Sequence, residues 1–357
     1  MPVRKLFKSI SNSKPVIAIA VFSVFALAVL TNPKETAQGA ANGLVMCAQT
    51  VIPSLFTFTV LSVFLTKSGV LCSAGSKIDR FTKRVFKISG DEIIAAVLSL
   101  MGGYPIGAAV LNGLYSQGRL SKNAAEKRLI FCINASPAFY IIVVGRNIFK
   151  NNSIGLILFF SNLISCIILN LLIKSESTRS KSRLKNTDIC LSDAFVASVN
   201  DGCLIMLGIC GWIVLFSSVF EYLKSFIGNE YILCGISGIL EVTIGVFENA
   251  GIHMPISVFA LLLGLGGLSS VFQVCFAAEK IKPSVLKLIT GRIIHALLSF
   301  LITKAAVAVF KPSVKTFAAS LSASNNSYYV YLPSIMLIIT GAAFLYFTAQ
   351  KNTKCEK

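Results

Sequence analysis

Long apolar runs, separated by short stretches that carry most of the charge, set the pattern of this chain. A helix needs about 20 apolar residues to cross the hydrocarbon core of a bilayer, and several runs reach or approach that length. The runs do not alternate apolar and polar residues, as the strands of a membrane β-barrel would. The pattern therefore predicts an all-α polytopic membrane protein. The runs cover residues 16–30, 44–65, 129–144, 154–173, 195–220, 256–278 and 328–347.

Glycine and proline interrupt four of the apolar stretches in the middle. The stretch 93–116 breaks at GGYPIG, and each arm of about ten residues would extend about 15 Å, which is half a bilayer. We expect it to form a re-entrant helical hairpin, and we expect a second hairpin at 231–247, which contains GILEVTIG. The motifs NASP, within 129–144, and GLGGLSS, within 255–278, predict two broken helices. A hairpin followed by a broken helix in each half predicts the inverted-repeat bundle that is typical of secondary transporters.

The positions of the basic residues predict the topology. Short cytoplasmic loops of membrane proteins are enriched in Lys and Arg. With the first hairpin opening to the cytoplasm, this rule places both termini in the cytoplasm and a short loop, 32–42, outside. The first apolar run could also belong to a cleaved signal peptide, but we favour a retained helix because it completes the bundle. The predicted regions are an N-terminal basic segment with the first transmembrane helix (1–42), a first repeat (43–173), a basic cytoplasmic linker (174–193), a second repeat (194–310), and a loop, last helix and basic tail (311–357).

Composition narrows the function classes. Only 13% of residues are charged, against about 25% in soluble domains. The net charge of +18 comes from basic residues scattered through short loops, so we expect a lipid bilayer and no nucleic acid as partner. Ten cysteines without a CxxC pair and two histidines argue against a disulfide framework or a metal site. Hydrolase, phosphate-loop and metalloprotease motifs are missing from the sequence, so we expect no enzyme and no cofactor. A homo-oligomer is compatible with helix faces made of small residues.

Polar residues at the breaks are the candidates for substrate binding. Helix N-termini exposed at such breaks favour an anionic group. Glu241 stands in an apolar segment, where a charge costs at least about 2.5 kcal/mol; it either handles substrate or protons or caps a helix at the hairpin tip. Arg292 could bind a carboxylate or extend to an interface, and nearby His295 is interpreted as a packing residue. The candidate substrate-binding residues are Gly103, Tyr104, Asn134, Ser136, Phe139, Glu241, Thr243, Ser269, Ser270, Gln273 and Arg292.

One block of sequence resembles a known family. The segment 102–145 joins GGYPIGA, a GRLS loop and NASP, and it resembles the signature of the YlbJ (SpoVV) family of sporulation integral membrane proteins. VIPSLFTFTVLSVFL, GILEVTIG and GLGGLSSVFQ resemble further blocks, so the resemblance covers roughly 43–278; Leu120 before Ser121 is a mild departure. That family belongs to the nucleoside-recognition gate group, which is similar to concentrative nucleoside transporters in its hairpin layout.

The resemblance implies a role in endospore formation, namely moving dipicolinate across the outer forespore membrane. Dipicolinate is a small aromatic dianion. Our own hypothesis, which the resemblance does not supply, is that helix N-termini at Gly103 and Ser136, together with Arg292, hold its carboxylates and that Tyr104 or Phe139 contacts its ring. Two alternatives stay open at this point: a permease for nucleosides, whose ribose Glu241 would bind, and a membrane scaffold or gate subunit that transports nothing.

Overall fold

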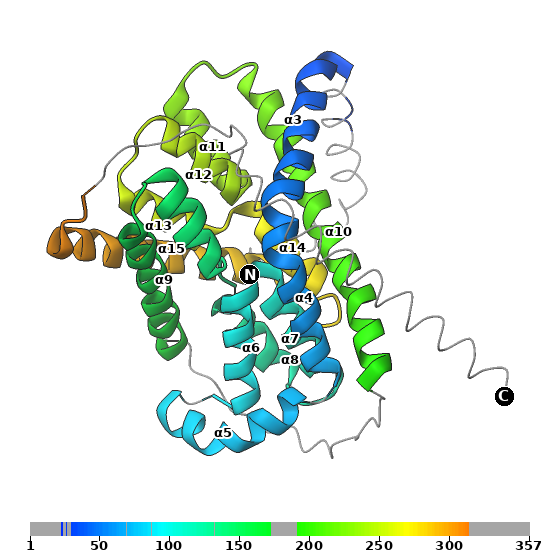
Figure 1. Ribbon diagram of the computed structural model, residues 1–357. Coiled ribbons are helices and arrows are strands. Elements are labelled where there is room, and N and C mark those ends of the chain that lie inside the picture. Colours follow the sequence, from blue (N-terminus) through cyan, green and yellow to red (C-terminus); the bar gives the residue numbers. More distant parts are fainter. Residues whose placement is uncertain are drawn as a thin grey trace, which may run out of the picture.

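The computed structural model describes residues 30–68, 70–86, 88–131, 133–172 and 191–313, together with positions 23 and 26 (Figure 1). Every regular element within these ranges is a helix. Most of the predicted first transmembrane helix, most of the basic linker 174–193 and the predicted last helix lie outside the described residues. The all-α fold class expected from the apolar pattern is therefore confirmed.

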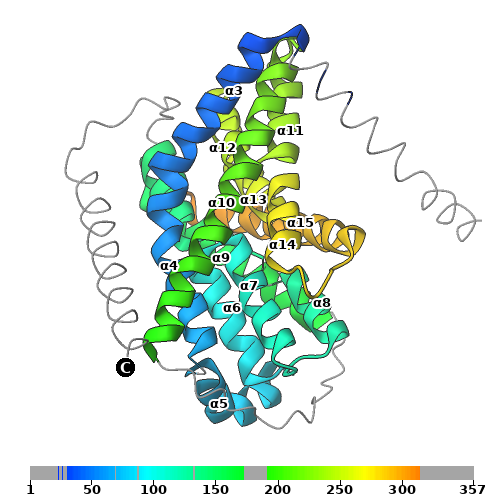
Figure 2. The same cartoon turned by 90° about the vertical axis from the view of Figure 1, so that its right-hand side faces the viewer.

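A long pair of elements forms one side of the bundle. Helix α3 (Pro33–Met46) continues through the π-helical turn η1 (Cys47–Val51) into α4 (Ile52–Lys67), with a bend of 63° between the two helices. The 34-residue helix α10 (Leu191–Lys224) runs beside both of them (Figures 1 and 2). Glycine permits this close packing, because a Cβ at Gly43 would lie 2.8 Å from the Cα of Val214. Most of the stretch 32–42, which we expected as an external loop, is helical in α3.

The first predicted hairpin is present. It follows α5 (Val70–Phe86) and consists of α6 (Gly90–Gly102) and α7 (Tyr104–Ser116). Gly103 separates its two arms with a φ of +88°. At the other end of the hairpin, Arg119 after α7 forms an ion pair of 2.5 Å with Asp91 at the start of α6. The two arms therefore return to the same end of the bundle, as a re-entrant hairpin requires.

The second predicted hairpin consists of α11 (Glu230–Leu240) and α12 (Val242–Gly251), with Glu241 at its tip. Its arms pack closely, because a Cβ on Gly245 would lie 2.6 Å from the Cα of Gly238. The side-chain amide of Asn249 donates to the carbonyl of Cys234 at 3.1 Å and joins the arms again. The hairpins occupy opposite halves of the bundle, with α6 and α7 below and α11 and α12 above in Figures 1 and 2.

Both predicted helix breaks lie between these hairpins. In the first half, α8 (Lys122–Phe131) ends before the non-helical residues 133–136, and the π-helical segment η2 (Phe139–Ile148) and α9 (Asn152–Leu172) follow. In the second half, α13 (Ile256–Leu265) and α14 (Gly267–Ala277) meet at Gly266 and Gly267, with φ of +75° and +74°. Each half thus contains a hairpin and then a broken element, although the inverted symmetry relating them stays a prediction.

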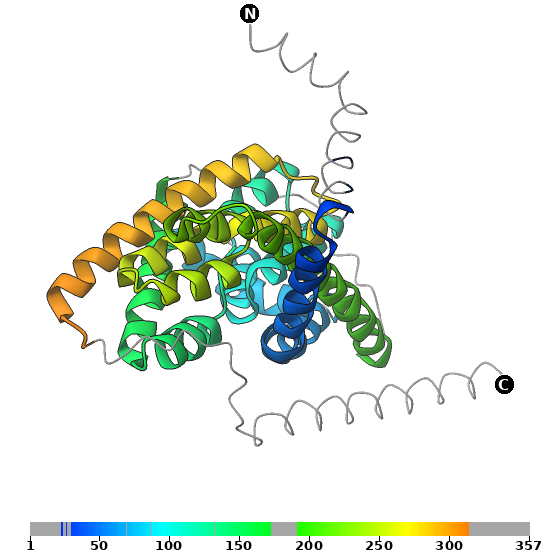
Figure 3. The same ribbon diagram turned by 90° about the horizontal axis from the view of Figure 1, so that it is seen from above.

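The outer surface of the bundle is apolar. Among the described residues, α9, α10, the broken pair α13–α14 and α15 (Val285–Phe310) are long and apolar enough to cross a membrane, and the bent pair of α3 and α4 would be a fifth span. Large apolar side chains project outward from them, including Leu207, which is 68% exposed, and Leu301, which is 59% exposed. Because water would disfavour such a surface, the chain is an integral membrane protein. Helix α15 packs on α13 and α9 and runs roughly crosswise to the direction of α3 and α10 (Figures 1 and 3).

Candidate substrate-binding site

A cavity lies where the tips of the two hairpins approach the two helix breaks. Its empty volume is about 550 Å³, including the part that is open to solvent. Helix breaks from both halves of the chain contribute to its wall. The cavity is lined by Thr50, Val51, Leu55, Gly103, Tyr104, Pro105, Ala135, Ser136, Phe139, Ile209, Ile213, Glu241, Val242, Thr243, Ser270 and Gln273.

The tip of the first hairpin brings the N-terminus of α7 to the cavity. Gly103 and Tyr104 line the wall here, and no side chain caps this helix end. The positive end of the α7 dipole therefore faces the cavity. The Tyr104 hydroxyl donates to the carbonyl of Leu263 at 3.0 Å and so joins this tip to the end of α13.

The tip of the second hairpin presents Glu241. Its carboxylate accepts hydrogen bonds from the backbone N–H groups of Thr243 at 2.7 Å and Ile244 at 2.9 Å, and from the Thr243 hydroxyl at 3.3 Å. It caps α12, where the helix dipole favours a negative charge. The residue is only 2% exposed, yet it also lines the cavity. The two interpretations drawn from the sequence, a helix cap and a cavity group, are compatible, because the same carboxylate occupies both places.

The NASP break places Ser136 and Phe139 in the cavity wall, at the start of η2. The Ser136 hydroxyl accepts a hydrogen bond of 3.3 Å from the backbone N–H of Phe139. Asn134 does not line the cavity; its side-chain oxygen accepts from the thiol of Cys166, 3.0 Å away on α9. This break therefore offers a hydroxyl and an aromatic ring to a ligand.

The break between α13 and α14 contributes neutral polar groups. Ser270 and Gln273 line the cavity, and the Ser270 hydroxyl donates to the carbonyl of Gly267 at 2.9 Å. Ser269 lies behind this wall, where its hydroxyl accepts from the amide of Gln273 at 2.9 Å. That bond fixes the orientation of the Gln273 amide beside the cavity.

Arg292 lies behind the cavity and does not line it. Its guanidinium donates to the carbonyls of Ile133 before the first break, and of Leu263 at 3.4 Å and Leu265 at 3.2 Å at the end of α13. It also lies over the ring of Tyr104, 5.7 Å from the ring centroid. Its charge is complemented by the negative end of the α13 dipole. In this structure Arg292 holds the two breaks together and does not reach into the space a substrate would fill.

Behind Arg292, a buried polar cluster joins α9 to α15. The Nδ1 atom of His295 lies 3.2 Å from the carbonyl oxygen of Gly264, and its Nε2 atom lies 3.3 Å from the carbonyl oxygen of Asn162; a neutral ring donates to one of the two. Its other neighbour is the thiol of Cys166 at 3.1 Å. These contacts are structural, as we expected for this histidine. Within the described ranges, no group of three or more His, Cys, Asp and Glu could hold a metal ion.

Sequence reasoning missed one wall of the cavity. Thr50, Val51 and Leu55 come from η1 and the start of α4, and Ile209 and Ile213 come from α10. The apolar residues of this wall cannot be recognised from the sequence, because they stand among similar apolar residues that face lipid. A signal near Thr50 is Pro53, three residues later, since proline disturbs helical hydrogen bonding and π-helical turns often mark functional sites.

Comparisons with known proteins found a similar sequence and two similar structures. No protein-family model matches the chain. The sporulation integral membrane protein YlbJ of Bacillus subtilis (strain 168) is 24% identical over an alignment that covers 72% of this chain and 74% of that protein.

Two solved structures of CNTnw, a concentrative nucleoside transporter, have similar folds. One variant is in the intermediate 3 state and the other is in an outward-facing state. Both align with a TM-score of 0.51 at 16% identity, the first covering 87% of this chain and 88% of that one, the second 86% of each. At this identity the likeness concerns the fold alone. The chain is thus similar in sequence to a sporulation integral membrane protein and similar in fold to a concentrative nucleoside transporter.

Proposed function

We propose that this protein is a transporter that moves a small organic solute across a membrane through the cavity between its two hairpin tips. The observation that carries the proposal is the meeting of helix breaks from both halves at one cavity. Broken helices inside a membrane protein leave main-chain groups unpaired unless protein or a water-filled site covers them. Secondary transporters use such breaks to bind their substrates. The proposal includes no chemical conversion of the solute.

Our first candidate for the solute is dipicolinate, moved across the outer forespore membrane during endospore formation, with both protein termini in the cytoplasm. The resemblance to a sporulation protein motivates this choice. Three features support it: the uncapped N-terminus of α7, the ring of Phe139 in the wall, and the charge of Arg292 behind Tyr104. Together they favour an aromatic ring that carries a negative group.

The second candidate is a nucleoside-type solute, and Glu241 favours it. A buried carboxylate in the wall repels an anion but accepts hydrogen bonds from the hydroxyl groups of a ribose. The neighbouring Thr243, Ser270 and Gln273 are neutral donors and acceptors of the kind that bind sugars and bases. The similar fold of a nucleoside transporter is compatible with this reading.

Substitution of Glu241 separates the two candidates, because its effect has opposite signs. The assay is uptake of radiolabelled dipicolinate and of uridine into proteoliposomes that contain wild-type protein or the Glu241→Gln variant. If dipicolinate is the solute, removal of the negative charge lowers its KM. If a nucleoside is the solute, loss of the carboxylate acceptor raises the KM for uridine. Thermal unfolding of both proteins in detergent checks that the α12 cap survives.

An aromatic solute also requires the ring of Phe139. The Phe139→Ala variant should raise the KM about five-fold, because aromatic contacts contribute about 1 kcal/mol beyond area burial. Phe160→Ala is the matched control, since Phe160 on α9 is 52% exposed and outside the cavity. If wild-type protein neither takes up nor is stabilised by either solute, transport is refuted for both candidates. That result would favour the alternative of a membrane scaffold or gate subunit that transports nothing.

A further inference from the structure

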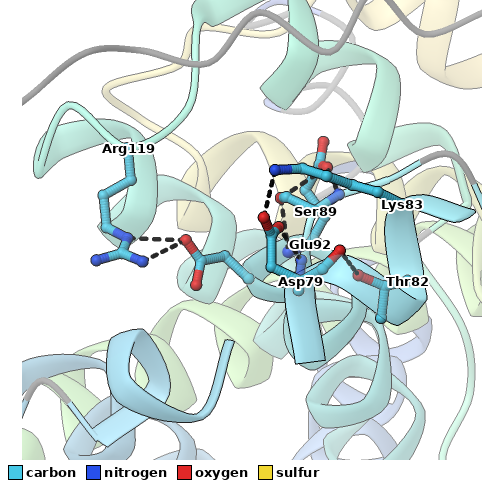
Figure 4. A network of polar contacts seen from close by, with 8 residues as sticks. Asp79, Thr82, Lys83, Ser89, Glu92 and Arg119 are labelled. Carbon is cyan, nitrogen blue, oxygen red and sulfur yellow. Dashed lines mark hydrogen bonds and ion pairs between the residues drawn. The ribbon is translucent and has the colours of Figure 1, made fainter. Parts of the chain in front are cut away.

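Helix α5 lies at one end of the bundle, below the first hairpin in Figures 1 and 2, and runs roughly crosswise to the long axis of the bundle. Its inner face is fixed to the base of that hairpin. The Asp79 carboxylate accepts from the backbone N–H of Gly90 at 3.1 Å and also pairs with Lys83 (Figure 4). Gly75 and Gly90 pack backbone to backbone, because a Cβ on Gly90 would lie 2.0 Å from the Gly75 carbonyl oxygen.

The start of α6, on which α5 packs, is itself well fixed. Ser89 and Glu92 form a capping box, in which each side chain binds the backbone N–H of the other residue. Glu92 also pairs with Arg128 of α8 at 2.7 Å, and both side chains are buried. Figure 4 shows Asp79, Ser89 and Glu92 grouped at this junction, with Arg119 approaching from the end of α7. A ligand that binds α5 is therefore connected through these contacts to the base of the first hairpin.

The outer surface of α5 carries two neighbouring stripes. Ile78, Phe81 and Val85 repeat at helical spacing and are 37%, 65% and 48% exposed. Lys77, Arg80 and Arg84 repeat at the same spacing one position earlier, and all three are exposed. Residues spaced by three and four share one face of a helix, so each set forms a stripe and the stripes adjoin. The side chain of Ile78 also packs beside Gly90, and none of the six residues lines the cavity of the proposed substrate site.

This combination fits a membrane surface. Helices that lie in the plane of a bilayer insert apolar side chains at the boundary between headgroups and acyl chains, and their basic residues contact the headgroups. We propose that α5 is a docking site for anionic phospholipid, with Ile78, Phe81 and Val85 in the boundary and Lys77, Arg80 and Arg84 on the phosphates. A soluble acidic partner would match the charges but would leave Phe81 and Val85 in water. Lipid bound here stabilises the base of the first hairpin.

The test uses the full-length protein purified in detergent, to which phosphatidylglycerol or phosphatidylcholine is added while thermal unfolding is followed. The test variant is Lys77→Gln/Arg80→Gln/Arg84→Gln. The control is Lys34→Gln/Arg146→Gln/Lys150→Gln, which removes three exposed basic residues from other parts of the chain. Phosphatidylglycerol should raise the Tm of wild-type and control protein more than phosphatidylcholine does.

In the α5 variant, the apparent affinity for phosphatidylglycerol should fall roughly 100-fold, because each basic residue near an anionic surface contributes about a factor of five. Its Tm in phosphatidylcholine should match that of wild-type protein, which excludes a folding defect. Two results would overturn the proposal. One is an α5 variant that phosphatidylglycerol stabilises as strongly as wild type, and the other is equal stabilisation of wild type by both lipids.

Discussion

Replacement of Arg292 by methionine tests how the two helix breaks are held together. The guanidinium donates to three main-chain carbonyls, those of Ile133, Leu263 and Leu265. The Leu263 carbonyl keeps the Tyr104 hydroxyl as a donor, so two carbonyls lose their Arg292 partner. A buried carbonyl that loses its partner costs about 1 kcal/mol or more, so these two cost at least about 2 kcal/mol. Removal of a buried charge returns part of this, and we expect a net loss of about 1–2 kcal/mol. Arg292→Lys should lose about half as much, since one ammonium group cannot reach all three carbonyls.

The assay is thermal unfolding in detergent without added solute, followed by uptake into proteoliposomes. Arg146→Met is the control, because Arg146 is exposed and should change stability by less than about 0.5 kcal/mol. A positioning role for Arg292 predicts lower stability in the absence of solute, together with lower uptake. If Arg292→Met is as stable as wild type and only its KM for an anionic solute rises, the residue binds substrate and the structural reasoning is refuted.

Three further substitutions probe the elements around the site, each by thermal unfolding in detergent. Glu241→Ala should cost about 2–4 kcal/mol, because two buried N–H groups of α12 lose their acceptor, and an unchanged Tm would mean that the cap does not matter. Arg128→Met should lower the free energy of unfolding by about 3–5 kcal/mol, because Glu92 is left buried without its ion-pair partner. The double variant Glu92→Leu/Arg128→Met should lose clearly less stability, and equal losses in the two variants would contradict this explanation. Gly103→Ala should cost about 1–3 kcal/mol, because φ of +88° and ψ of −173° suit only glycine, and no loss would show that the hairpin tip can relax.

Sequence reasoning located the breaks because their signals are local. Gly103 and Pro105 are unfavourable in the interior of a continuous helix, and so are Gly266 and Gly267. Glu241 was conspicuous for a similar reason, since a carboxylate in an apolar segment requires a partner. Most candidates drawn from these signals line one cavity in the structure. Their role in binding stays a prediction.

The directions in which side chains point could not be predicted from the sequence. Arg292 was a candidate for binding a carboxylate or for extending to an interface because its charge stood out in the segment, but the way α15 crosses the end of α13 directs the guanidinium to main-chain carbonyls. The α10 wall was missed for the opposite reason. Ile209 is 2% exposed and Leu207 is 68% exposed, yet both are aliphatic residues in one uninterrupted apolar run, and only tertiary packing decides which of them faces the protein.

The helical start of α3 was also missed. The stretch 32–42 contains Pro33, Lys34 and Glu35 and reads as a loop between two apolar runs. Proline at the first position of a helix is favourable, however, because the N–H it lacks would have no helical partner there. Packing of Gly39 and Gly43 against α10 then supplies stability that the local sequence does not reveal.

The most direct test of the account is whether filling the cavity stops transport. Ser136→Trp places a large ring in the cavity wall, and Ser153→Trp places the same ring at an exposed position on α9. Uptake of dipicolinate and uridine into proteoliposomes is measured for both variants and for wild-type protein, at matched amounts of folded protein. If the solute passes between the two hairpin tips, Ser136→Trp abolishes the uptake seen with wild type while Ser153→Trp retains it. Uptake by Ser136→Trp at the wild-type rate would contradict the claim that the solute passes between the two hairpin tips.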